Sequence, residues 1–97
     1  AGIATHFVRA RLASHALPAF PGVLPGDLDA AYRVQDAAIF LWPDQIAGWK
    51  VGWVPEPFAS RFGEERLIGP IFEGGVVNAC ANDPVPAPVF VGGFAAI

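Results

Sequence analysis

Apolar residues recur at helical spacing in two segments of the chain. Residues 4–16 carry an apolar stripe with arginines beside it, which predicts a first helix. A longer stripe at i, i+3, i+4 and i+7 spacing predicts a second helix over residues 28–42. Asp27 is a suitable N-cap for it, and Pro43 ends it. The proline-rich residues 17–26 predict an extended connection between the two helices.

An alternating pattern predicts a β-strand over residues 46–53 whose two faces differ. One face is entirely apolar and consists of Ala47, Trp49, Val51 and Trp53. The other face carries Lys50 between Gly48 and Gly52. We expect the tryptophan face to be anchored in a core, which leaves Lys50 facing an open space above the strand.

The remaining segments predict short and irregular elements. Residues 56–66 indicate a short helix or turn that Gly63 breaks, and residues 70–78 a strand or strand-loop. Residues 79–88 form a proline-rich loop, and residues 89–91 could open another strand. Ten prolines and eleven glycines imply many turns, so we expect an α+β fold with irregular connections.

Length and composition limit the class of protein. The chain has 97 residues, of which 54% are apolar and 15% charged, too hydrophobic for a disordered segment. The net charge is −3 and six lysines and arginines are scattered, so no nucleic-acid-binding surface is expected. No apolar run reaches the roughly 18 residues of a membrane span. The single cysteine, Cys80, excludes an intrachain disulfide and is expected to be a small core residue. The apolar surplus indicates surface to be buried against a partner or further chain.

Lys50 is the best candidate for chemistry. Between two glycines its ammonium group, a compact positive charge with three donors, suits a carboxylate or enolate oxygen. A solvated lysine on the outer face of an edge strand, which discourages aggregation, explains it about equally well. Glu73 could act as a general base if it were buried, although an exposed strand-end residue is simpler. The chain lacks a carboxylate cluster suited to Mg²⁺ or Mn²⁺.

Four stretches, in this order, resemble the N-terminal part of the 2-keto-4-pentenoate hydratase and 4-oxalocrotonate decarboxylase family, within the fumarylacetoacetate hydrolase superfamily. They are FVRARL, DLDAAYRVQDA, AGWKVGW and GPIFEGGVV. The second stretch has Tyr32 and Gln35 in the family's Ala-Tyr-x-x-Gln pattern. The third is similar to its Gly-aromatic-Lys-Ile/Val-Gly strand. Together these stretches cover nearly the whole chain.

The resemblance implies that residues 1–97 are a single region with the N-terminal helices and strands of a mixed β-roll, incomplete in this chain. The part that binds Mg²⁺ or Mn²⁺ is expected beyond residue 97, so no metal ligand is expected within it. By position, Lys50 would be catalytic, and Gly48, Gly52 and Phe72 would bind substrate.

The resemblance also implies a function. It indicates a cytoplasmic, homo-oligomeric lyase of aromatic catabolism that hydrates or decarboxylates short unsaturated 2-keto acids through a metal-bound enolate. The 97 residues alone would be inactive. Its partners would be the small 2-keto acid and the remainder of its own domain or another subunit, with neither nucleic acid nor membrane. The alternatives are a non-catalytic binding or oligomerisation module on the same scaffold, and an acylpyruvate-type C–C hydrolase.

The chain departs from the family pattern in two places. Trp53-Val54-Pro55 stands where members often continue with Leu-Thr-Ser. Ile71 stands where several members carry an acid with a proposed acid–base role, which puts the usual hydratase proton transfer in question. Glu73, two residues on and on the same strand face, could substitute for that acid.

Overall fold

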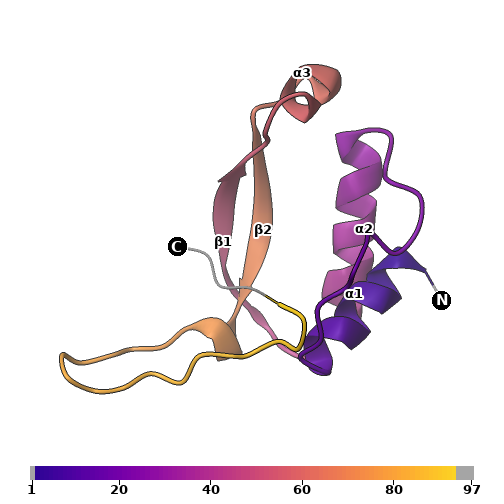
Figure 1. Cartoon of the computed structure of the whole chain (residues 1–97). Helices are drawn as coiled ribbons and strands as arrows, with labels where there is room; N and C mark the ends of the chain where they lie inside the picture. Colours follow the sequence, from indigo (N-terminus) through magenta and orange to yellow (C-terminus); the bar gives the residue numbers. More distant parts are fainter. Residues whose placement is uncertain (1, 94–97) are drawn as a thin grey trace.

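The fold is a pair of helices beside a two-stranded β-ribbon (Figure 1). The computed structural model describes residues 2–93. In chain order the elements are α1 (Ile3–Leu12), α2 (Leu28–Leu41), β1 (Ile46–Trp53), α3 (Phe58–Phe62), β2 (Arg66–Phe72) and a 3₁₀ turn at Glu73–Gly75. Helices together with an antiparallel ribbon confirm the predicted α+β class. No helix in the described range is long and apolar enough to cross a bilayer.

The two predicted helices both form, with changes at their boundaries. The carboxylate Oδ1 of Asp27 accepts the N–H of Ala30 at 2.7 Å, which confirms the predicted N-cap of α2. Residue 42 already has an extended backbone, as expected before a proline. The first helix ends at Leu12, earlier than predicted, because Ser14 takes a left-handed conformation with φ 55° that an α-helix cannot contain.

The strand predicted over residues 46–53 forms as β1 and pairs antiparallel with β2. The short helix α3 lies between them and ends at Gly63, whose left-handed backbone (φ 70°) is the usual way for a glycine to end a helix. The register places Lys50 opposite Gly69 and Val51 opposite Ile68.

The second strand corrects the strand predicted over residues 70–78. It spans Arg66–Phe72 and stops at the 3₁₀ turn Glu73–Gly75. Pro70 therefore lies inside the strand and not at its start. It comes two residues after Ile68, whose N–H points away from β1. The nitrogen of Pro70 faces the same outer side, so its missing N–H removes no hydrogen bond between the strands.

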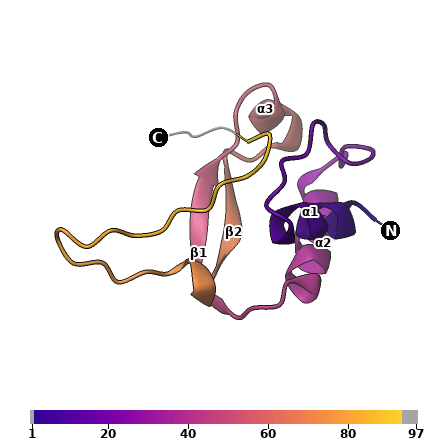
Figure 2. The same cartoon turned by 60° about the horizontal axis from the view of Figure 1, so that its bottom comes forward.

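The buried core is small and does not include the tryptophans of β1. Its members are Ala4, Val8, Val54, Ala59 and Phe72. The prediction that the tryptophan face is anchored in a core is wrong, because the side chains of Trp49 and Trp53 are 52% and 67% exposed. Figures 1 and 2 show the reason: the two long helices lie beside the ribbon, along its β2 edge, and do not cover its face.

Residues 76–90 form a long loop that extends away from the helices in both views (Figures 1 and 2) and returns to the end of α1 at Phe90. Cys80 lies on it and is exposed, so the prediction of a core cysteine is wrong. The strand predicted over residues 89–91 does not form in the described part of the chain. Only an isolated β-bridge between Val91 and His15 is present there.

Candidate functional site

Lys50 lies in the middle of one face of the ribbon, and glycines surround it. Side chains alternate along a strand, so Lys50 shares its face with Gly48 and Gly52. Residues opposite each other in an antiparallel pair point to the same face. The residue opposite Lys50 is Gly69, so glycine flanks the lysine along β1 and also across to β2.

The space beside Lys50 is open on the side of Gly48, where an added Cβ atom would meet no heavy atom within 4 Å. A Cβ atom added to Gly52 would lie 3.4 Å from the Leu67 side chain, and one added to Gly69 would lie 3.5 Å from Nε2 of Gln35. Lys50 itself is exposed. A bare strand of this kind lets a ligand approach the backbone closely while the ammonium group binds its negatively charged end. The same exposure also suits a solvated lysine.

Phe72 lies on the opposite face of β2 from Gly69, because the two residues are an odd number of positions apart. Its ring is buried and packs against Trp42, with ring centroids 5.7 Å apart. The guanidinium carbon of Arg11 lies 4.6 Å from the centre of the Trp42 ring. These three side chains line a cavity of about 190 Å³ between α1, α2 and the end of β2. The structure therefore does not bring Phe72 and Lys50 together.

Ile71 and Glu73 occupy different positions relative to Lys50. Ile71 pairs with Gly48 and lies on the lysine face, so an acid there would stand beside the ammonium group. Glu73 is the first residue of the 3₁₀ turn and is exposed. Its backbone N–H donates to the carbonyl of Gln45 at 2.9 Å, which closes the end of the ribbon. The expectation that Glu73 continues the strand face of Ile71 is wrong, because the strand ends at Phe72.

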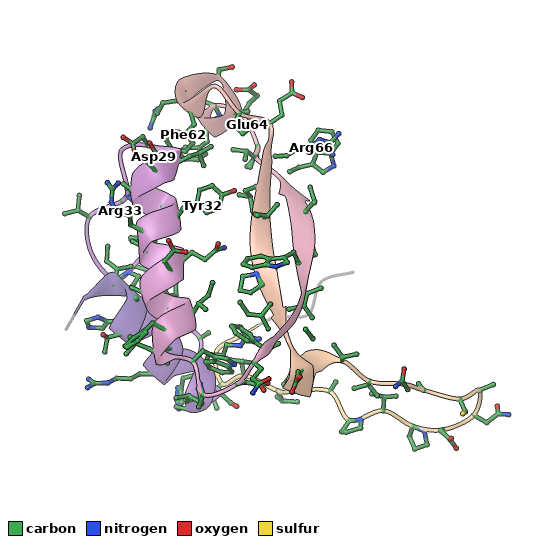
Figure 3. The ribbon with its side chains drawn as sticks, turned by 180° about the vertical axis from the view of Figure 1, so that it is seen from behind. Asp29, Tyr32, Arg33, Phe62, Glu64 and Arg66 are labelled. Atoms are coloured by element: carbon green, nitrogen blue, oxygen red, sulfur yellow. The ribbon has the colours of Figure 1, made fainter. Side chains whose placement is uncertain are left out.

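Tyr32 and Gln35 hold the outer edge of β2. The hydroxyl oxygen of Tyr32 accepts the N–H of Ile68 at 3.0 Å, and Nε2 of Gln35 donates to the Ile68 carbonyl at 2.9 Å. Figure 3 shows Tyr32 reaching from α2 toward the strands. The sequence analysis identified the Tyr-x-x-Gln spacing but did not predict that these two side chains bind the backbone of β2. Both side chains fall on one helix face because they are three residues apart, but nothing in the spacing names their target.

The described residues do not supply a metal site. Within residues 2–93 no group of three or more histidine, cysteine, aspartate or glutamate side chains lies close enough to hold an ion. The carboxylate of Asp44 has a structural role. Its two oxygens accept the backbone N–H groups of Gly74 and Gln45, both at 2.8 Å. These bonds connect the residue before β1 to the turn that follows β2.

Comparisons with known proteins give no relative. The chain matches no protein-family model, no curated protein and no solved structure among those searched.

Proposed function

We propose that this chain supplies the lysine-bearing part of a divalent-metal-dependent hydratase or decarboxylase that acts on short unsaturated 2-keto acids. The observation that carries the proposal is the exposed ammonium group of Lys50 on a strand face where its three nearest neighbours, Gly48, Gly52 and Gly69, have no side chains. The order of sequence stretches that resembles the 2-keto-4-pentenoate hydratase family supports the same assignment.

The role we assign to Lys50 is electrostatic. Removing a proton from a 2-keto acid, or CO₂ from its relative, leaves negative charge on the former keto oxygen. A fixed cation beside that oxygen stabilises the transition state more than the ground state, because the charge is only then developing. The glycine floor lets the planar substrate lie flat against β1, within reach of the ammonium group.

A divalent cation would bind the carboxylate and keto oxygens of the substrate and act as a Lewis acid. The described residues do not fit such an ion, so its ligands would come from outside them. We expect that part to approach the lysine face of the ribbon, as another segment of the polypeptide or as another subunit. A homo-oligomeric cytoplasmic enzyme is the form in which we expect the activity.

The assay uses the complete polypeptide with Mg²⁺ or Mn²⁺. Hydration of 2-keto-4-pentenoate is followed by absorbance, and decarboxylation of 4-oxalocrotonate by release of CO₂. In an active protein, Lys50→Met should lower kcat by about 10²–10³, and Lys50→Arg should recover part of the loss. Arg33→Met, which removes an exposed cation from the far side of α2 (Figure 3), should leave kcat unchanged. Wild-type protein without either activity refutes the enzyme, and an active Lys50→Met variant refutes the role of the lysine.

A non-catalytic binding or oligomerisation module is the second candidate. The exposed side chains of Trp49 and Trp53 favour it, since a large apolar surface commonly marks an interaction site. In that case replacement of the tryptophans would change association and replacement of Lys50 would leave it unaltered.

A further inference from the structure

The two outer edges of the ribbon differ. On β2, both backbone groups of Ile68 are hydrogen-bonded to Tyr32 and Gln35 of α2. On β1, no further strand pairs with the outer edge among residues 2–93. An open edge presents unpaired N–H and C=O groups to any strand of suitable register.

The register identifies which residues present those groups. Ile68 points its N–H and C=O away from β1, so its partner Val51 points its own groups away from β2. The inner side agrees, because Val54, an odd number of positions from Val51, donates its N–H to the Glu65 carbonyl at 2.9 Å. The outward-facing backbone N–H and C=O groups of β1 are therefore those of Trp49, Val51 and Trp53. The side chains of these three residues share one face of the strand.

We propose that a second copy of this chain adds its β1 to this edge, antiparallel, about a two-fold axis through Val51. Val51 then pairs with Val51 of the second copy. Trp49 pairs with Trp53 of the second copy, and Trp53 pairs with its Trp49. Each of these pairs exchanges two backbone hydrogen bonds. The result is a continuous four-stranded sheet in the order β2-β1-β1-β2.

Charge and backbone chemistry disfavour the two adjacent registers, whose axes lie at Lys50 and at Gly52. With the axis at Val51, each Lys50 lies opposite Gly52 of the second copy. An axis at Lys50 would place two ammonium groups directly opposite each other, which is destabilising. An axis at Gly52 would bring Pro55 opposite Trp49 in the hydrogen-bonding row, and proline has no N–H to give. Lys50 is the only charged residue of β1, and in this register the two lysines lie diagonally across the axis, about 7–8 Å apart, farther than a directly opposed pair.

The apolar surface on this edge is less than half of what a stable interface buries, so it suits only a weak dimer. Trp49, Val51 and Trp53 are 52%, 57% and 67% exposed. A tryptophan buries up to about 250 Å², so the two indoles together offer roughly 300 Å² per copy. A stable interface buries about 800 Å² per partner. We therefore expect a dimer that forms at high micromolar concentration, with tryptophan stacking across the axis.

The test uses sedimentation velocity of the full-length protein from about 1 to about 300 µM, the range over which a small interface dissociates. Wild type should shift from one copy to two as concentration rises. Val51→Lys and Val51→Glu each place like charges opposite themselves at the axis, so each alone should stay monomeric. An equimolar mixture of the two should recover the dimer. Val23→Lys, at a valine that is 86% exposed and distant in sequence, should behave as wild type.

Circular dichroism of the two Val51 variants controls for folding, and recovery in the mixture shows by itself that both remain folded. Wild type that stays monomeric to the highest concentration refutes the proposal and points to another segment of the same polypeptide on this edge. A dimer that both Val51 variants keep also refutes it. The inference does not depend on the proposed enzyme, because a dimer can form whether or not the protein hydrates a 2-keto acid.

Discussion

Replacing Tyr32 with phenylalanine tests whether α2 holds the ribbon in place. The variant keeps the aromatic ring and removes only the oxygen that accepts the Ile68 N–H at 3.0 Å. A net intramolecular hydrogen bond is worth about 0.5–1.5 kcal/mol. Ile68 is 44% exposed, so water can solvate the freed amide. We therefore expect a loss in the lower half of that range, about 0.5–1 kcal/mol.

Gln35→Met extends the test to the other backbone group of the same residue. It removes the Nε2 donor that lies 2.9 Å from the Ile68 carbonyl and keeps a side chain of similar length. Each substitution frees one group of Ile68, so Tyr32→Phe combined with Gln35→Met should lower the free energy of unfolding by about 1–2 kcal/mol.

Two readouts measure the effect in the full-length protein. With a urea m-value of about 1–3 kcal/mol per molar, Tyr32→Phe should lower the unfolding midpoint by about 0.2–1 M. Hydrogen exchange at the Ile68 amide should accelerate about two- to fivefold, since 1.4 kcal/mol corresponds to a factor of ten. Arg33→Met, next along α2 but pointing away from the ribbon (Figure 3), is the matched control. If the midpoint and the Ile68 exchange rate both stay at the wild-type values, the hydroxyl does not hold β2 and the reasoning fails.

Two further substitutions test local features of the fold by urea denaturation. Asp27→Ala removes the oxygen that caps α2 through the Ala30 N–H at 2.7 Å and should cost about 0.5–2 kcal/mol; Asp29→Ala, without that bond, should cost only a few tenths through the helix dipole, about 0.3 kcal/mol. Gly63→Ala places a side chain on a backbone with φ 70°, where the added Cβ atom meets no other atom within 4 Å. Backbone strain alone should therefore lower the free energy of unfolding by about 1–2 kcal/mol. Gly75→Ala, at a site that is equally open but has no positive φ, should lower it by less. An equal loss in either matched pair would contradict the assignment.

The sequence predicted well those elements whose signals are local. The second helix carries its cap at Asp27, its apolar stripe and its stop at Pro43 within one continuous segment. The strand of Lys50 is equally self-contained, since alternation alone sets its bounds. The early end of α1 was missed because the left-handed backbone of Ser14 has no strong signature in a serine.

The errors arise where a residue's place depends on distant parts of the chain. Pro70 suggested the start of a strand, yet it lies inside β2 because its nitrogen faces the outer edge, which only the register determines. Trp49 and Trp53 were expected in a core because their strand face is entirely apolar. Their exposure follows from the helices lying at the β2 edge, and no pattern within the strand encodes on which side a helix packs.

The candidate site shows the same division. The glycines on either side of Lys50 are visible in the sequence, but Gly69 joins them only through pairing of the two strands. Phe72 was grouped with the lysine because it resembles a family position, whereas the alternation of β2 places it on the other face, against Trp42. Whether Phe72 binds a substrate stays a prediction.

One chain of contacts links α2 to the orientation of Lys50. Tyr32 and Gln35 fix the outer edge of β2 at Ile68, and the ribbon register carries that position to Val51, directly opposite. A slip of β1 by one residue would move Lys50 away from Gly69 and turn it to the side of the sheet that the indoles now occupy, while the indoles would turn to the side that Lys50 now occupies. The helix therefore contributes more than stability: by holding the backbone of Ile68 in β2, it also favours the register in which Gly69 lies opposite Lys50.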